Sequence, residues 1–135
     1  MCYNSDCRIE IKSCIDGSES NVSAHGKVEK TINGYRFDYL LDGDQCTLIV
    51  DGDEIVQSRR GEQNIKMIFR KGEQTECFLE NYGFSGVFSA FTHDLQCTMR
   101  DINSGFGTNQ IFKLIIIYTT CEQKIKLEFS AEYKV

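Results

Sequence analysis

Apolar and polar residues alternate along several stretches of the chain, most regularly in segment 123–134. Every second position there is apolar, and charged or small polar residues lie between. These apolar positions are Ile125, Leu127, Phe129, Ala131 and Tyr133. Successive side chains of a β-strand point to opposite faces, so one face of this strand is predicted to lie in a core and the other in water. Segments 8–15 and 34–41 show the same alternation.

Short turn signals separate the alternating stretches. Asn33-Gly34 and the Asp-Gly pairs at 16–17, 42–43 and 51–52 tolerate the positive φ that tight hairpins require. Because the connections are short, neighbouring strands should pair antiparallel as a meander. The predicted strands cover 8–15, 22–32, 34–41, 45–50, 54–59, 64–70, 74–80, 84–92, 95–101, 109–119 and 123–134.

An open sheet of this many strands would leave two exposed edges, and the chain has no proline to protect an edge. We therefore predict an all-β protein in which an antiparallel meander of about 8–10 strands closes into one small barrel. This barrel is expected to be a single domain spanning residues 1–135.

Two predicted strands, in segments 84–91 and 111–118, are apolar on both faces and should be covered on both. The predicted cover is a second copy of the chain, which would give a homodimer. A terminal segment folded over these strands is the alternative. The side chains expected at the interface are Val87, Phe91, Phe112, Leu114 and Ile116.

Composition and charge support this prediction and narrow the possible partners. Ile, Phe, Thr, Val and Tyr, which favour strands, make up 43 of the 135 residues. The net charge of −5 disfavours nucleic acid as a partner. The longest apolar run, 114–118, is far shorter than the ~20 residues of a membrane-spanning helix, and residues 1–15 have no signal-peptide pattern. A cytoplasmic protein with no membrane partner is expected.

Seven cysteines are spread over the chain, an odd number without closely spaced pairs. Reduced thiols fit this pattern better than a disulfide framework. Zinc sites usually contain two cysteines separated by two residues, whereas four residues separate Cys2 from Cys7 and six separate Cys7 from Cys14. We expect no metal and no cofactor.

No set of residues has the spacing of a known catalytic site. His25 and His93 fall on different predicted strands, and no Gly-x-Ser-x-Gly elbow is present. No catalytic residue is predicted, and an enzyme is not expected. A locally basic stretch between Arg59 and Lys71 either gathers an anionic ligand at a barrel rim or is an ordinary solvated hairpin, because Glu62 and Glu73 dilute its charge.

Several short motifs recur in an order typical of one family. They are Ile11-Lys12-Ser13, Gly26, Arg60-Gly61, Met67-Ile68-Phe69, Gly72, Tyr82-Gly83 and Thr92. In these motifs the chain resembles the YwiB-like family of small bacterial proteins, calycin-like β-barrels of unknown function. The resemblance implies a lipocalin-like barrel in a bacterial cytoplasm and brings no established catalytic residue. The chain departs from the family at Glu80-Asn81, where the family tends to have Thr-Pro, and it lacks the tryptophan of secreted lipocalins.

A ligand site on such a barrel would lie in its interior or at its open mouth. Arg60 is the candidate anion partner and Tyr82 the candidate aromatic wall, although a surface ion pair and core packing would also explain them. The main hypothesis is a non-enzymatic binding module for a small apolar or amphipathic ligand. The alternatives are a protein-interaction domain acting through a homodimer or another partner, and a barrel filled by its own aromatic side chains.

Overall fold

The computed structural model describes residues 4–81 and 83–135, which form ten strands. The strands are β1 (Asn4–Ile15), β2 (Ser18–Thr31), β3 (Gly34–Leu41), β4 (Asp44–Asp51), β5 (Glu54–Arg60), β6 (Gln63–Arg70), β7 (Gln74–Asn81), β8 (Phe84–Ser104), β9 (Gly107–Thr120) and β10 (Gln123–Lys134). In these two stretches of chain, no helix is long and apolar enough to cross a membrane.

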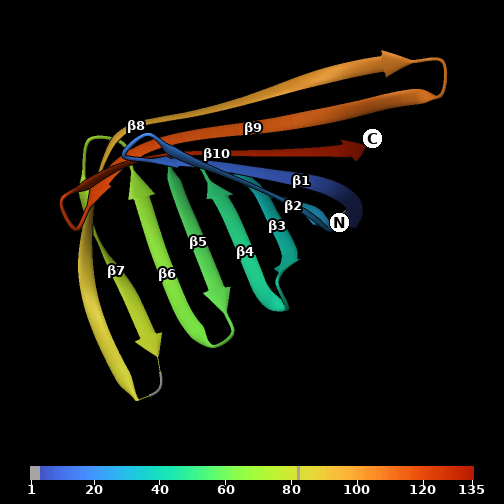
Figure 1. Ribbon diagram of the computed structural model, residues 1–135. Helices are drawn as coiled ribbons and strands as arrows, with labels where there is room; N and C mark the ends of the chain where they lie inside the picture. The colour runs from blue at the N-terminus through green and yellow to red at the C-terminus, as the bar shows by residue number, and fades with distance from the viewer. Residues whose placement is uncertain (1–3, 82) are drawn as a thin grey trace.

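Each strand pairs antiparallel with the next, and β1 pairs with β10 to close the barrel. Figure 1 shows β3 to β7 running steeply across the direction of β1, β9 and β10, with β8 bending from one group to the other. The antiparallel meander and its closure confirm the predicted fold class.

The predicted strands 84–92 and 95–101 are one continuous strand, β8. A β-bulge between Thr92 and Asp94 shifts the register with β9 by one residue instead of ending the pairing. A bulge bends a strand while its pairing continues on either side, so the predicted gap between the strands 84–92 and 95–101 is a bend within one strand. Beyond the bulge, β8 stays paired with β9, and the tip of this hairpin, residues 103–108, extends past the end of the β9–β10 pairing (Figure 1).

Aromatic rings fill the barrel where β3, β9 and β10 face one another. The Phe37 ring lies 5.1 Å from the ring of Phe112 and 5.2 Å from the ring of Phe129, measured between centroids. All three side chains are buried. Such contacts are worth ~0.5–1.5 kcal/mol each beyond the burial of apolar area. This part of the interior is therefore occupied by the protein itself.

Three residues predicted for the dimer interface belong to this core. Phe112, Leu114 and Ile116 are 2%, 0% and 0% exposed and point into the barrel, so they are not available to an outer interface. Their cross-strand partners on β10 include Phe129 and Leu127, both inward-facing. Alternation along β9 separates its two faces but does not show which is inside, and the pairing with β10 decides it.

The outer face of β9 carries Ile115 and Ile117, both partly buried. Long polar side chains are their cross-strand neighbours: Gln96 and Glu128 flank Ile115, and Lys126 is one neighbour of Ile117. The apolar stems of such side chains can cover neighbouring apolar surface. These isoleucines are therefore partly shielded within the sheet itself.

Gly26 allows β2 to approach β3 closely as the sheet curves. A Cβ at this position would lie 2.2 Å from the backbone oxygen of Asp38 and 2.8 Å from the Cβ of Tyr39. No side chain fits in that space, so the close packing of these two strands requires glycine.

The β6–β7 ladder is incomplete. Its pairing runs from Gln63↔Asn81 to Lys66↔Phe78 and stops there. Further along the two strands, the Thr75 hydroxyl donates a hydrogen bond to the backbone oxygen of Ile68. A side chain thus satisfies a carbonyl that the ladder leaves unpaired.

Candidate functional site

A large concave region lies on the outer surface over β2 to β5. This outer groove encloses about 740 Å³, and its lining includes Lys27, Asp38, Thr47, Ser58 and Arg60. Lys27, Asp38, Thr47 and Ser58 are successive cross-strand partners, so they form one row across four strands. The groove is polar and charged, unlike the barrel core.

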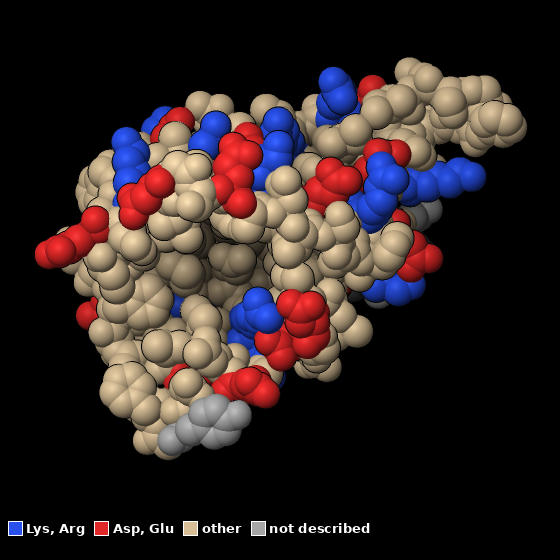
Figure 2. Space-filling model, in the orientation of Figure 1, with Lys and Arg blue, Asp and Glu red and all other residues tan. Residues whose placement is uncertain are grey.

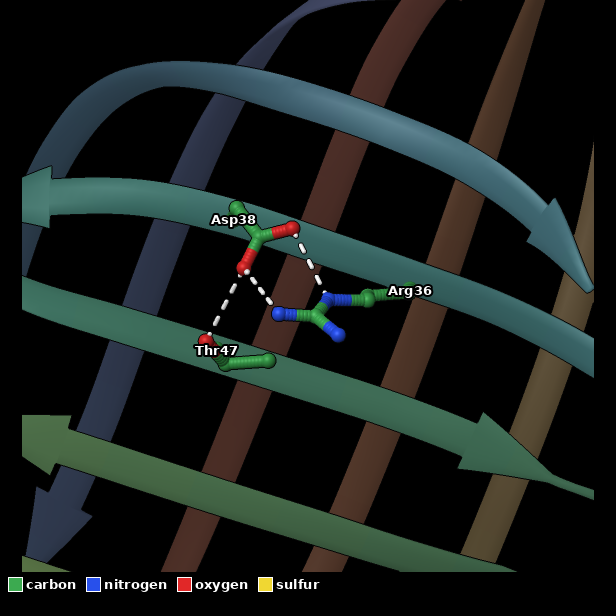
Figure 3. Close-up of polar contacts among 3 residues, drawn as sticks. All are labelled: Arg36, Asp38 and Thr47. Carbon is green, nitrogen blue, oxygen red and sulfur yellow. Dashed lines mark hydrogen bonds and ion pairs between the residues drawn. The ribbon is translucent and has the colours of Figure 1, made fainter. Parts of the chain in front are cut away.

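An ion pair with an additional hydroxyl contact lies in the outer groove (Figure 3). Arg36 donates through Nε to Oδ2 of Asp38 at 3.0 Å and through Nη2 to Oδ1 at 3.2 Å. Thr47 Oγ1 donates to the same Oδ1 at 3.0 Å. The hydrogen bonds that Arg36 donates to Asp38, together with the negative charge of Asp38, raise the pKa of Arg36 above its usual value. The Asp38 carboxylate is therefore already engaged by three donors.

Lys27 forms a second ion pair of the groove with Asp6 on β1. The hydrogen bond and charge of Lys27 lower the pKa of Asp6. Both side chains are largely exposed, so the pair adds little stability but fixes the local charge. His25, whose side chain is exposed, lies nearby on β2 and also lines the groove.

Arg60 lies at the end of β5, where its exposed side chain lines the outer groove. It also lines an adjoining groove of about 640 Å³ with Lys66, Phe78 and Val87. The sequence predicted Arg60 at the barrel mouth, whereas the structure places it on the outer wall. Its neighbour Arg59 points inward and pairs with Asp44 at 2.7 Å.

A second concave region, of about 290 Å³, lies at the end of the barrel where β1 begins and β10 ends. We call it the barrel-end pocket. Val28, Tyr35 and Tyr133 form its apolar wall, and Val28 and Tyr133 are 4% and 9% exposed. The ring of Tyr35 also packs 5.8 Å from Phe112, which fixes this wall to the aromatic core.

The hydroxyl of Tyr133 is held inside the pocket. It donates a hydrogen bond to Oε1 of Gln110 at 3.0 Å. Burial, followed by the proximity of Tyr35, raises the pKa of Tyr133 to about 12, so the phenol stays neutral at physiological pH. The pocket therefore combines an apolar wall with neutral hydrogen-bonding groups.

Two lysines border the barrel-end pocket. Lys30 on β2 and Lys134 on β10 line it, and both side chains are exposed. Within residues 4–81 and 83–135, neither lysine forms an ion pair. The rim is positively charged above an apolar wall, which is the arrangement that an amphipathic anion requires.

The remaining predicted site residues are Tyr82, Val87 and Phe91. Tyr82 lies outside the described residues. Val87 and Phe91, predicted for a dimer interface, are 61% and 39% exposed on β8. Phe78, 44% exposed, is the cross-strand partner of Val87, so an apolar outer patch of these three side chains covers part of β7 and β8.

Among the residues that the structure describes, the histidines and cysteines do not gather into a reactive centre. His93 Nε2 lies 2.7 Å from Thr119 Oγ1, and its ring packs against Phe91. In the part of the chain that the structure describes, no three His, Cys, Asp or Glu side chains gather as a metal-binding group. The six described cysteines are free thiols, among which Cys7, Cys46 and Cys77 are buried.

The barrel-end pocket is not evident from the pattern of apolar and polar residues along the chain. The alternation places Tyr35 and Tyr133 on apolar strand faces. Tyr35 is the second residue of β3 and Tyr133 is the second-to-last residue of β10, so both lie at the same end of the barrel. An inward aromatic residue near a strand end, with a lysine close by, was the available signal. The pairing of Cys7 with Tyr133 brings β1 and β10 together there, and this closure is not visible in local patterns.

Positive and negative side chains are interspersed on the face of the molecule in Figure 2, which has a hollow below the layer of β1, β9 and β10. Charge on this face is mixed, as expected from the composition. Ligand selectivity must therefore come from individual side chains and local concave sites.

The fold and these sites define a closed, ten-stranded antiparallel β-barrel with an open end and a grooved outer wall. The chain is similar to a solved structure described as the ywiB protein from Bacillus subtilis, with a TM-score of 0.78 and 14% sequence identity. The match covers 98% of this chain and 94% of that one. This likeness shows a shared fold. No family model and no curated protein matches the chain.

Proposed function

We propose that the protein is a non-enzymatic binding module that holds a small amphipathic anion in the barrel-end pocket. The observation that carries the proposal is an apolar wall, in which Val28 and Tyr133 are buried and Tyr35 is partly buried, with Lys30 and Lys134 at its rim. An apolar tail would pack on the wall, and an anionic head would meet the two ammonium groups.

The pocket limits the size of the ligand. Its volume of about 290 Å³ is at the lower end of the ~300–1,000 Å³ typical of small-molecule sites. The aromatic core below it is filled, so the tail cannot extend deep into the barrel. A medium-chain carboxylate such as octanoate matches these limits, whereas a long-chain fatty acid does not.

Isothermal titration calorimetry with octanoate tests the proposal. We expect saturable binding of octanoate and weaker binding of octanol, because octanol lacks the charge that the rim lysines attract. The double variant K30Q/K134Q should lose the preference for octanoate over octanol. The control K124Q/K126Q removes two lysines of β10 that do not line the pocket and should keep that preference. Equal binding of both probes to the unmodified protein would contradict the proposal.

The resemblance to YwiB-like, calycin-like barrels bears on the fold of this chain and its relatives. We propose that the chain is a distant relative of these cytoplasmic barrels, since its likeness to the B. subtilis protein extends over nearly the whole chain. The binding role itself rests on the pocket.

A protein-interaction role is the second candidate, and the apolar outer patch of Phe78, Val87 and Phe91 supports it. Phe78 and Val87 lie directly opposite each other, and Phe91 lies four residues further along the same face of β8. Exposed apolar side chains gathered on one face commonly mark interaction surfaces. A homodimer through this patch should dissociate in V87E while the monomer stays folded, as measured by sedimentation equilibrium and circular dichroism. A monomeric unmodified protein at high micromolar concentration would rule out the homodimer.

A further inference from the structure

We propose that the outer wall has a second binding site, in which Arg60 and Lys66 bind the phosphate of a small organic phosphate monoester. This site is separate from the barrel-end pocket and extends beyond the proposed function. It lies where the outer groove meets the adjoining groove, since Arg60 and Ser58 line both.

The first reason is the state of the Arg60 guanidinium. Arg8, Arg36, Arg59 and Arg70 each pair with a carboxylate. Arg60 makes no such pair with any residue that the structure describes, although it borders two concave regions. An arginine offers five N–H donors in a fixed fork that matches the oxygens of a phosphate.

The second reason is the set of groups around Arg60. Gln45 is its cross-strand partner on β4, and Ser58 lies two residues before it on the same face of β5. Ser58 in turn pairs with Lys66 on β6. Directly opposed side chains have Cβ atoms ~4.5–5.5 Å apart, so an amide, a hydroxyl, a guanidinium and an ammonium group share one small area. All four can donate hydrogen bonds to an oxyanion.

The third reason is that the carboxylates lining the two grooves already have partners. Asp38 accepts hydrogen bonds from Arg36 and Thr47, and Asp6 pairs with Lys27. Glu80 accepts a hydrogen bond from Nδ2 of Asn64 at 3.3 Å. The two ion pairs are close to neutral, so Arg60 and Lys66 outweigh the charge of Glu80 and attract an anion.

Apolar side chains on either side of these donors favour an organic ester over the free ion. Leu40, 60% exposed, lines the outer groove, and Phe78 and Val87 line the adjoining groove. An organic group attached to the phosphate would cover part of this exposed apolar surface. A phosphate monoester carries about −1.5 to −2 charges at pH 7, which suits two cations better than a carboxylate does.

Titration calorimetry at constant ionic strength tests this site with phenyl phosphate, inorganic phosphate and benzoate as probes. We expect saturable binding of phenyl phosphate, at least tenfold weaker binding of inorganic phosphate, and the weakest binding for benzoate. R60Q should weaken phenyl phosphate at least tenfold, and K66Q several-fold. The matched control R100Q removes an exposed arginine of β8 that forms no ion pair within residues 4–81 and 83–135 and lies far along this strand from both grooves. It should change the affinity less than twofold.

Equal losses in R60Q and R100Q would overturn the site, because they would reveal attraction by net charge alone. Absence of saturable phenyl phosphate binding would also overturn it, and benzoate binding as tightly as phenyl phosphate would overturn the phosphate assignment. Octanoate binding should be unchanged in R60Q, so the two sites can fail independently. Thermal unfolding of R60Q and K66Q confirms that both variants remain folded.

Discussion

Gly26 has almost no room for a side chain, because an added Cβ would lie 2.2 Å from the backbone oxygen of Asp38. An added Cβ would meet backbone atoms of β3, which cannot move aside as a flexible side chain could. We expect G26A to lower the free energy of unfolding by about 1–3 kcal/mol or more, as forced overpacking does. Urea denaturation measures this change.

The matched control is G86A. At Gly86, a Cβ would lie 3.4 Å from an atom of the Phe84 ring, and that ring is free to shift. We expect G86A to change stability by less than ~1 kcal/mol. If G26A were tolerated as well as G86A, the close packing of β2 on β3 would be refuted.

Tyr133 should make the free energy of unfolding depend on pH in the alkaline range. Its pKa rises from the usual value of about 10 to about 12 on folding, mainly through burial. Between these values the unfolded chain has released the proton and the folded protein has kept it, so the stability contributed by Tyr133 is complete below about pH 10 and is lost as the pH rises to about 12. The free energy of unfolding of Y133F should therefore fall less steeply over this range. An identical slope in Y133F and the unmodified protein would contradict the burial of this hydroxyl.

At the scale of single elements, two buried threonines near the incomplete β6–β7 ladder should respond oppositely to the same substitution. The Thr75 hydroxyl serves the backbone oxygen of Ile68, whereas the buried Thr92 hydroxyl has no partner among the described residues. T75V should cost about 1–3 kcal/mol because a buried carbonyl loses its donor, and T92V should be neutral or stabilising. Chemical denaturation of both variants measures the difference. Similar destabilisation by both would show that the hydroxyl of Thr92 is also bonded.

How far the sequence predicts the structure differs from strand to strand. On β10, strict alternation identified the inward face correctly from Ile125 to Tyr133. On β9, both faces are apolar, and the inward residues Phe112, Leu114 and Ile116 were placed outside. On β8, the predicted gap between two strands is a bulge within one strand. Local patterns encode strands, but the side that faces inward and the continuation through a bulge depend on pairing with distant strands.

The same reasoning applies to the sites. Arg60 was predicted as an anion partner because its type and its basic surroundings are local features. Its place on the outer wall and its neighbours Gln45 and Lys66 result from the registers β4–β5 and β5–β6. The barrel-end pocket requires closure of the barrel between β1 and β10, the most distant strand pair in the sequence.

At the scale of the whole molecule, the closed barrel should protect its inward thiols. Cys97 and Cys121 are exposed, whereas Cys7, Cys46 and Cys77 are buried. Burial raises the pKa of Cys7 to about 11, and the thiolate is the reactive form. Iodoacetamide labelling read by peptide mass spectrometry should therefore modify Cys97 and Cys121 first and reach the buried thiols only in denaturant. Early labelling of Cys7 would contradict the β1–β10 closure around it.

The central claim is that the open end of this barrel binds a small amphipathic anion. The most direct measurement is the set of intermolecular nuclear Overhauser effects between octanoate and the protein in solution. We expect contacts from the octanoate tail to the Tyr35 and Tyr133 rings and to the Val28 methyl groups, which line the pocket. Contacts confined to the outer patch of Phe78, Val87 and Phe91, with none at the tyrosines, would contradict it.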